Sequence, residues 1–290
     1  MRSILMVVMC FICAQAYTQS ASSPFAQSRK GQFYIYWGYN RAYYDESDLH
    51  FKGDGYDFTL YNAKAEDMPE RFTWKGYFNP TRLSIPQFNF HLGYFINENT
   101  AISIGTDHMK YHLIQTQDVI IDGHIDESYA PDSATAAEYT GEFDMERMLY
   151  TAKFMNFHHS NGFNFVRASI EKRANIWGSK NGQHLLNVSG AASVGIMLPW
   201  TDFTFFGKNY PNWLHVAGYG FSAQSGFRYE FKKHFFVQVQ GQIGWSNLPD
   251  ILLEDEKPSR ADQKIVFFQR SWAVGTYFGM PRRTKKVEDK

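Results

Sequence analysis

The sequence predicts an all-β fold: an eight-stranded antiparallel up-and-down β-barrel that spans a membrane. Three observations lead to this prediction. Segments of 12 to 17 residues alternate apolar with small or polar side chains, the connections between them alternate in length, and aromatic residues gather near the segment ends. Soluble strands are typically about 5–6 residues long, whereas a strand tilted across a bilayer needs about 9–11 residues.

The first 16 residues are expected to be a secretory signal peptide. Residues 1–3 give a short positive region, residues 4–13 an apolar region, and Ala14-Gln15-Ala16 a small-x-small cleavage site. Both cysteines of the chain lie in this segment, so the expected mature protein cannot depend on disulfides. Residues 17–30 are then expected to form a periplasmic N-terminal segment.

Composition excludes several other classes of protein. The chain of 290 residues has 29 basic and 29 acidic residues, a balance that argues against a nucleic-acid partner. Its mean hydropathy of −0.42 is too low for a bundle of membrane helices. The longest apolar run, residues 4–14, is about half of the ~20 residues that a spanning helix needs.

The barrel is predicted over residues 31–278, and its plainest segments show which face meets lipid. Leu186, Val194, Ile196, Phe221 and Val239 belong to apolar rows, while the alternate positions carry mostly Gly, Ser and Gln. A narrow barrel needs small groups inside, so the apolar rows are expected to face lipid. A soluble sandwich would instead bury the apolar rows in a shared core. The predicted strands cover residues 31–44, 85–96, 100–112, 163–177, 184–198, 215–231, 235–246 and 264–278.

The connections fit a barrel with both ends in the periplasm. Three are short (97–99, 178–183 and 232–234) and four are long (45–84, 113–162, 199–214 and 247–263). Short periplasmic turns and long extracellular loops are typical of such barrels. Within the first loop, Gly53-Asp54-Gly55 joins two short apolar stretches, which indicates a hairpin. We expect this hairpin to stand above the membrane; if it were inserted, the barrel would have ten strands.

The last segment ends in the aromatic-rich run 272–278, followed by a polar tail over residues 279–290 that is expected to be periplasmic. This ending resembles the final strand of outer-membrane barrels, although the tail is a departure from barrels that end on the aromatic. The whole pattern resembles the small outer-membrane β-barrel proteins of the OmpA/OmpX kind, and its aromatic-heavy strands are similar to barrels of Bacteroidetes-type bacteria. The resemblance implies the outer membrane of a Gram-negative cell, with lipids and lipopolysaccharide as neighbours, and implies no activity.

The inward rows carry charges, which we expect to pair because an isolated buried ion costs several kcal/mol. The predicted lumen network consists of Arg167, Glu171, Arg173, Arg228 and Glu230. Such a network would plug the lumen, and a proton or ion path is the functional alternative.

One motif suggests chemistry. His-x-Ser-Asn-Gly at residues 158–162 resembles the signature of the lipid A 3-O-deacylases, which are outer-membrane barrels. The resemblance implies a serine esterase in which His158 activates Ser160. The family places its orienting acid about twelve residues after the serine, where this chain has Lys172; Glu171 could serve only if a bulge near Gly162 shifts the register. The alternative is that the motif is structural and lies at the outer rim.

Other candidate sites are weaker. His108 and His112 share a strand face without an evident third metal ligand. Five acidic residues of the first loop lack the spacing of a calcium loop: Asp45, Glu46, Asp48, Asp54 and Asp57. We therefore expect no metal and no cofactor. The favoured function is non-enzymatic: a monomeric plugged barrel with an envelope structural role or an extracellular partner bound through loops 45–84 and 113–162. The alternatives are a lipid A acyl hydrolase, a small-solute channel and a soluble secreted β protein.

Overall fold

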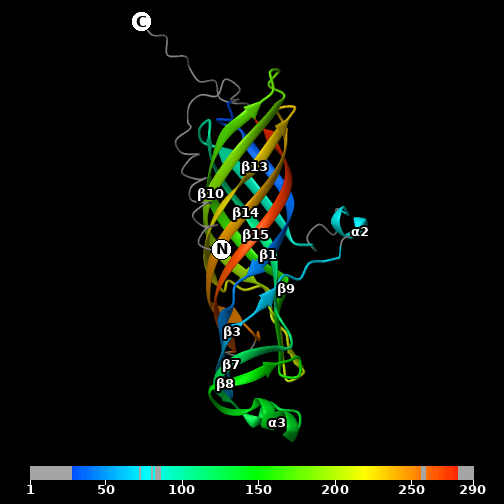
Figure 1. Ribbon diagram of the computed structural model, residues 1–290, viewed down its shortest axis with the longest axis vertical. Coiled ribbons are helices and arrows are strands. Elements are labelled where there is room, and N and C mark those ends of the chain that lie inside the picture. Colours follow the sequence, from blue (N-terminus) through cyan, green and yellow to red (C-terminus); the bar gives the residue numbers. More distant parts are fainter. Residues whose placement is uncertain (1–27, 72, 80, 82–85, 256–258, 280–290) are drawn as a thin grey trace.

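A closed ring of eight antiparallel strands forms the body of the protein (Figure 1). The computed structural model describes residues 28–279 except 72, 80, 82–85 and 256–258. The ring runs β1-β5-β6-β9-β10-β13-β14-β15, and pairing of β15 with β1 closes it. Its strands are β1 (Phe33–Tyr44), β5 (Phe88–Phe95), β6 (Thr100–Leu113), β9 (Met155–Gly178), β10 (His184–Pro199), β13 (Gly218–Phe231), β14 (Phe235–Leu252) and β15 (Arg260–Phe278). The predicted eight-stranded barrel is confirmed.

The barrel is apolar outside and polar inside over most of its length. Val194, Phe221 and Val239 point outward and are 51%, 50% and 56% exposed. Ser193 and Gln224, from the alternate positions, are buried in the lumen. The apolar rows therefore do not meet in a shared core, which excludes the soluble sandwich and leaves lipid as their surroundings. Within the described residues, no helix is both long and apolar enough to cross a bilayer.

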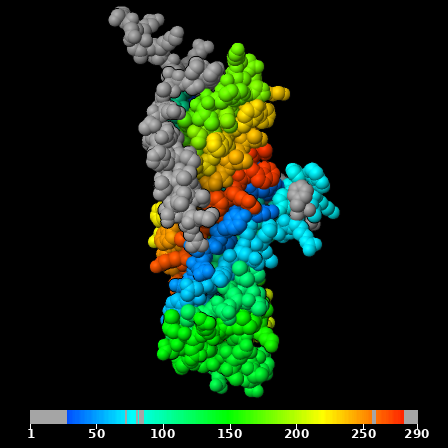
Figure 2. Space-filling model, in the orientation of Figure 1, coloured from blue at the N-terminus to red at the C-terminus, as the bar shows by residue number. Residues whose placement is uncertain are grey.

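At the end opposite the short turns, the chain builds a second unit, here called the head, from β2, β3, β7, β8, β11, β12 and α3. The barrel wall continues into it, because β2 pairs with the start of β15 and is followed by β3, β7 and β8. On the other side, β11 pairs with the start of β9. Figure 2 shows the head as a solid block below the barrel. The remaining elements are β2 (Ser47–Gly53), β3 (Tyr56–Ala63), β4 (Ala65–Glu66), α2 (Trp74–Tyr77), β7 (Gln117–Ile125), a 3-10 turn (Glu127–Tyr129), α3 (Ser133–Tyr139), β8 (Gly141–Tyr150), β11 (Asp202–Phe205) and β12 (Lys208–Tyr210).

One hydrophobic core is shared by the head and the adjoining end of the barrel. Phe157, Phe163 and Phe165 of β9 point inward and are fully buried in it. Phe51 of β2 contacts Phe157 edge to face, with ring centroids 5.4 Å apart. Burying one such ring contributes about 1.5–3 kcal/mol. The head is thus held on the barrel by the same core that occupies the head-side end of the barrel.

Several strands extend beyond their predicted ends. β9 begins at Met155 rather than at residue 163, β14 continues to Leu252, and β15 begins at Arg260. They extend because, beyond the lipid-facing belt on the head side, they continue to pair with each other and with strands of the head. The hairpin predicted in the first loop is β2–β3, and it lies in the head outside the ring, so the ten-stranded alternative is wrong.

The first described residues lie at the short-turn end. The Gly31 amide donates to the Phe95 carbonyl, and the Gln32 side chain donates to the Gly279 carbonyl. Both ends of the described chain therefore lie together at this mouth of the barrel. The expected signal peptide, residues 17–27 of the expected N-terminal segment and residues 280–290 of the tail lie outside the described residues.

Val239→Arg tests whether the outer face contacts lipid. Placing arginine in the apolar belt should lower the stability of the protein in bilayers, by up to about 2–4 kcal/mol. Denaturant unfolding in vesicles measures this change. Asp144→Arg, on an exposed position of β8, is the control and should change stability by less than about 0.5 kcal/mol. Equal effects of the two substitutions would contradict the lipid-facing assignment.

Candidate functional site

An ion-pair group centred on Glu230 lies in the lumen at the short-turn end. Arg173 Nη1 donates to Glu230 Oε1 at 2.7 Å, and Arg29 Nη2 donates to Oε2 at 2.5 Å. The Tyr277 hydroxyl and the Asn187 amide donate to Oε1 at 2.7 and 3.1 Å. The Arg29 guanidinium also lies 3.8 Å from the centre of the Tyr277 ring. One buried carboxylate therefore pairs with two cations at this mouth of the barrel.

Two further ion pairs occupy the lumen beyond this group. Arg228 Nη2 lies 3.1 Å from Glu171 Oε2, and its Nε donates to the Gln238 side chain at 2.9 Å. Arg167 Nε donates to Asp107 Oδ2 at 2.7 Å. The charged atoms are almost completely enclosed, at 4% exposure or less for each side chain.

Neutral polar groups surround the Arg167–Asp107 pair. Arg167 also donates to Ser169 and Ser193 at 2.7 Å and to Gln224 at 3.0 Å. His91 Nε2 lies 3.0 Å from Asp107 Oδ1. These contacts spread the charge of the pair over four strands of the wall, so the side chains bridge the lumen.

All five residues predicted for the lumen network point into the lumen, with one change of partner and one addition. Arg167 pairs with Asp107 rather than with a glutamate. Arg29 joins from the segment before β1, which was expected to lie outside the barrel. No sequence signal calls for Arg29, because the strands alone supply three arginines and three carboxylates.

The His-x-Ser-Asn-Gly motif lies on the outer face of β9, in its head-side extension. Ser160 Oγ donates to Asp202 Oδ2, and Asn161 Nδ2 lies 3.2 Å from the same oxygen. His158 Nε2 lies 3.5 Å from it as well. Asp202 begins β11 and stands directly opposite His158 in the β9–β11 pairing. Three side chains of the motif thus converge on one carboxylate.

The candidate acid Glu171 does not belong to this group. It points into the lumen and pairs with Arg228, while His158 points outward. The register shift expected near Gly162 is present, because residues 159–163 of β9 lie opposite only residues 109–111 of β6. It adds two residues to β9, so His159 and Phe163 on its two sides both point inward, and His158 and Glu171 remain on opposite faces. The proposed approach of Glu171 to His158 is therefore wrong.

Asp202 supplies the acid that local spacing could not reveal, since strand pairing brings it to the motif from 42 residues away. Its position differs from a serine–histidine–acid relay, where the imidazole lies between the other two groups. Here the carboxylate lies between Ser160 and His158. Lys172, at the position that the resemblance assigns to the acid, is exposed.

The glycine of the motif has a structural explanation. Gly162 has a φ of +144°, a conformation that side-chain-bearing residues rarely adopt. A Cβ there would lie 2.5 Å from Asn164 Nδ2 and 2.8 Å from His108 Cε1. The backbone conformation therefore favours glycine at this position, and a side chain there would also press on His108 of β6 and Asn164 of β9.

The two histidines considered as metal ligands have separate partners. His108 Nδ1 lies 2.7 Å from Asn164 Oδ1, and its ring stacks on Phe88. His112 Nδ1 lies 3.6 Å from Glu66 Oε1. Across the part of the chain that the structure describes, no group of three or more His, Cys, Asp or Glu side chains is arranged to hold a metal ion.

The acidic residues of the first loop do not form one cluster of ligands. Glu46 lies 3.8 Å from Lys64 Nζ, the Asp48 carboxylate accepts from the Asn62 amide, and Asp57 pairs with Lys52 at 3.0 Å. Each of these carboxylates is engaged at a different point of the β2–β3 hairpin and its surroundings.

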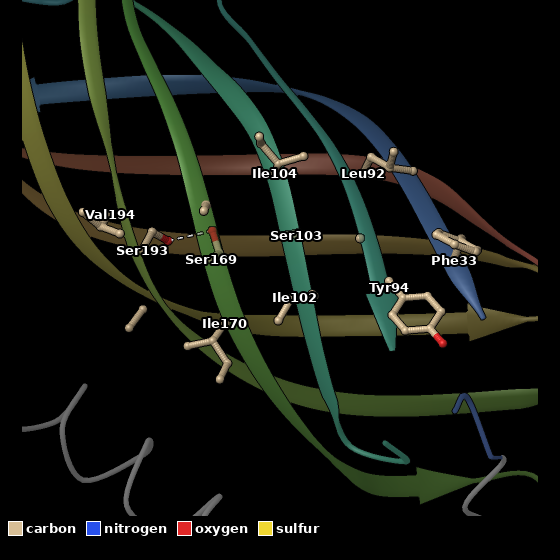
Figure 3. A pocket seen from close by; sticks show the side chains of 13 residues that line it. Phe33, Leu92, Tyr94, Ile102, Ser103, Ile104, Ser169, Ile170, Ser193 and Val194 are labelled. Atoms are coloured by element: carbon tan, nitrogen blue, oxygen red, sulfur yellow. Dashed lines mark hydrogen bonds between the residues drawn. The ribbon is translucent and has the colours of Figure 1, made fainter. Parts of the chain in front are cut away.

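A shallow hollow of about 740 Å³ lies on the outer face of the barrel, across β5, β6, β9 and β10 (Figure 3). Ile102, Ile104, Ile170 and Val194 line it as outward-pointing apolar side chains. Its lining is apolar because it is part of the lipid-facing belt. We assign it no role beyond contact with acyl chains.

Comparison with known proteins gives structural neighbours only. No family model matches the chain, and neither does any curated protein. Among solved structures, the outer membrane protein AlkL is 12% identical with a TM-score of 0.40, covering 92% of this chain and 100% of its own. The outer membrane protein OprG from Pseudomonas aeruginosa is 11% identical with a TM-score of 0.39, covering 88% and 99%. Neisserial surface protein A is 8% identical with a TM-score of 0.37, covering 85% and 97%. At these levels the likeness carries nothing about activity.

A charged triplet joins the head to the barrel wall. His50 of β2 lies 2.7 Å from Asp262 of β15 through Nδ1 and 2.7 Å from Asp57 of β3 through Nε2. Desolvation lowers the pKa of His50, but the hydrogen bonds to the two carboxylates outweigh it and leave the pKa raised. The same contact with His50 lowers the pKa of Asp57. Protonated His50 can donate to both aspartates and hold three strands together.

The raised pKa of His50 predicts a pH-dependent attachment of β2–β3. Its contribution to stability is complete below the unfolded pKa of about 6.5 and is lost as the pH rises through the higher folded value. Amide hydrogen exchange of β2–β3, corrected for the intrinsic pH dependence, should show more protection at about pH 5.5 than at about pH 8. His50→Asn should abolish the difference. An unchanged pH dependence in that variant would show that the triplet is not its cause.

Proposed function

We propose that the protein is an outer-membrane barrel with a closed lumen that presents the head outside the cell for contact with a partner. The observation that carries this proposal is the continuous filling of the barrel. Ion pairs bridge the lumen at the level of the belt, and a packed aromatic core fills the end next to the head. An eight-stranded barrel has just enough interior for its own side chains. A small-solute channel would need this interior to open.

The head provides a surface with a definite charge. The segment 113–162, which includes β7, α3 and β8, has nine acidic and two basic residues. Glu142, Asp144 and Glu146 of β8 are all exposed. A surface of this kind attracts cationic partners and repels anionic ones. The partner class that we propose is therefore a cationic peptide or protein segment.

Planar-bilayer recording with the purified protein tests the closed lumen. We expect no stable channel, because every path along the barrel axis meets the ion pairs and then the aromatic core. Arg29→Ala should also remain closed, since it removes only one layer of this filling. A stable open channel in the wild-type protein would refute the closed barrel.

Proteoliposomes of the same protein test the head. Oligolysine should bind and oligoglutamate should not, with binding weakened as salt rises. Replacing Glu142, Asp144 and Glu146 with serine should weaken oligolysine binding, whereas Ser128→Ala should not. Binding that ignores both salt and these substitutions would remove the acidic surface as the recognition element.

A second candidate function, acyl hydrolysis of lipid A, is favoured by the carboxylate of Asp202 beside His158 and Ser160. For this chemistry the His158 ring would have to turn so that a nitrogen reaches Ser160 Oγ and accepts its proton. Ser160 Oγ would then bond to the ester carbonyl carbon as the ester C–O bond breaks, and the sugar hydroxyl would leave with the proton taken by His158. Water, deprotonated by His158, would hydrolyse the acyl-serine to the free fatty acid and restore Ser160.

Mass spectrometry of lipid A separates the two functions. If the protein hydrolyses lipid A, cells that make the Ser160→Ala or His158→Ala variant should retain on lipid A an acyl chain that wild-type cells remove. Thr204→Ala, on the neighbouring strand β11, is the control and should leave the wild-type pattern. Identical lipid A in cells with and without the protein would eliminate the hydrolase.

A further inference from the structure

A short side arm, defined as residues 67–71 and 73–79, leaves the barrel wall where the outward side chains change from apolar to charged. On β1 the outward row passes from Trp37 to Arg41, and on β6 it passes from Ile104 to Lys110. Such a change marks the level of the lipid headgroups on a membrane barrel. Figure 1 shows helix α2 of the arm standing out sideways from the wall at the head-side half of the barrel.

The arm is fastened to this level by one buried aromatic residue. Tyr77 is 4% exposed, and its ring packs on Tyr39 with centroids 4.9 Å apart. The Tyr39 hydroxyl donates to the Tyr77 carbonyl, and Arg41 Nη2 donates to the Tyr77 hydroxyl at 3.2 Å. Tyr39 in turn contacts Trp272, an outward aromatic of the belt. The arm is thereby continuous with the lipid-facing surface.

Two large aromatic side chains of the arm are largely exposed. Trp74 is 74% exposed and Phe78 is 55% exposed, and their rings lie 5.0 Å apart. Trp74 is the most exposed of the large hydrophobic side chains described. Tryptophan and other aromatic side chains favour the boundary between acyl chains and headgroups. An aromatic pair held at this level has lipid as its natural surroundings.

The acidic and basic residues of the arm are also separated: the acidic ones contact the barrel and the basic ones are exposed. Its acidic residues face the protein: Asp67 accepts from the Gln87 side chain and the Ala42 amide, and Glu70 pairs with Lys110 at 3.3 Å. Its basic residues, Arg71 and Lys75, are exposed. The arm therefore presents aromatic and positive groups, whereas the head is acidic.

From these observations we propose that the side arm is a membrane-interface anchor for lipids of the head-side leaflet whose phosphates leave them with a net negative charge. Trp74 and Phe78 enter the boundary between acyl chains and headgroups, and Arg71 and Lys75 contact lipid phosphates. Anchoring of this kind fixes the height and tilt of the barrel, and it holds the acidic head clear of the anionic membrane surface. It does not depend on which partner the head binds.

The test uses a nitroxide label on the arm. Asn79→Cys, with Cys10 and Cys13 replaced by serine, keeps both aromatic and both basic side chains of the arm. Ser133→Cys, on exposed α3 of the head, is the matched control. In vesicles of phosphatidylcholine with phosphatidylglycerol, collisions with oxygen should exceed those with a water-soluble nickel complex at residue 79, and the reverse should hold at residue 133. Heat-modifiable gel mobility confirms that each variant is folded.

Charge reversal tests the phosphate contact separately. Arg71→Glu and Lys75→Glu together should move the label at residue 79 toward water in the mixed vesicles, by about fivefold in the embedded-to-exposed ratio for each lost cation. Arg147→Glu and Lys153→Glu, on the head, should leave it unchanged. In pure phosphatidylcholine the arm reversal should have a much smaller effect.

Two results would overturn the proposal. Equal access of the nickel complex to residues 79 and 133 would show that the arm lies in water or serves another partner. A label that is embedded to the same depth in both vesicle types, whatever the charge at residues 71 and 75, would exclude lipids of net negative charge as the ligands of Arg71 and Lys75.

Discussion

Closure of a narrow ring in lipid is the constraint on which the rest of the structure depends. Lipid offers no hydrogen bonds, so every backbone group of the wall must pair within the sheet, and the contact of β15 with β1 removes the last free edge. Eight strands enclose only a thin column of space. Any side chain that points inward is therefore desolvated, and its charge needs a partner. The pairs Arg167–Asp107, Arg228–Glu171 and Arg173–Glu230 follow from this enclosure.

A single wall serves two surroundings, and its polarity reverses between them. Along β9 the inward row is aromatic through Phe165 and charged from Arg167 onward, while the outward row is polar at His158 and Ser160 and apolar at Ile170. The reversal occurs where the outside medium changes from water to lipid. Where water surrounds the strand, its inward-pointing residues are apolar. Where lipid surrounds it, its outward-pointing residues are apolar. The head and the barrel are thus continuous in backbone and opposite in amphipathicity.

This reversal explains how much of the fold could be predicted from sequence. Alternation with apolar rows outward identified all eight barrel strands, because lipid enforces that pattern over whole segments. The same criterion placed the start of β9 at residue 163 instead of Met155, because the residues in the head-side part of the strand follow the opposite pattern. The lumen residues followed from parity alone. The position of Arg29 could not be predicted in this way. Arg29 precedes β1 and belongs to no strand, so no alternating pattern indicates that it pairs with Glu230.

Strand pairing decides what the His-x-Ser-Asn-Gly motif is in this chain. A sequence motif indicates which of its side chains share a face. The acid of a serine–histidine–acid relay can lie on another strand, and its position is then set by how the strands pair. Asp202 arrives beside Ser160 and accepts its hydrogen bond directly, so the proton that a base must remove is already directed at a carboxylate. His158 Nε2 lies 3.5 Å from the same oxygen, so the imidazole contacts the carboxylate. Gly162 has a positive φ within the register shift of β9, so every residue type named in the motif has a structural explanation. Hydrolysis would require that junction to rearrange at His158, which makes the orientation of one imidazole ring the point on which the two functions differ.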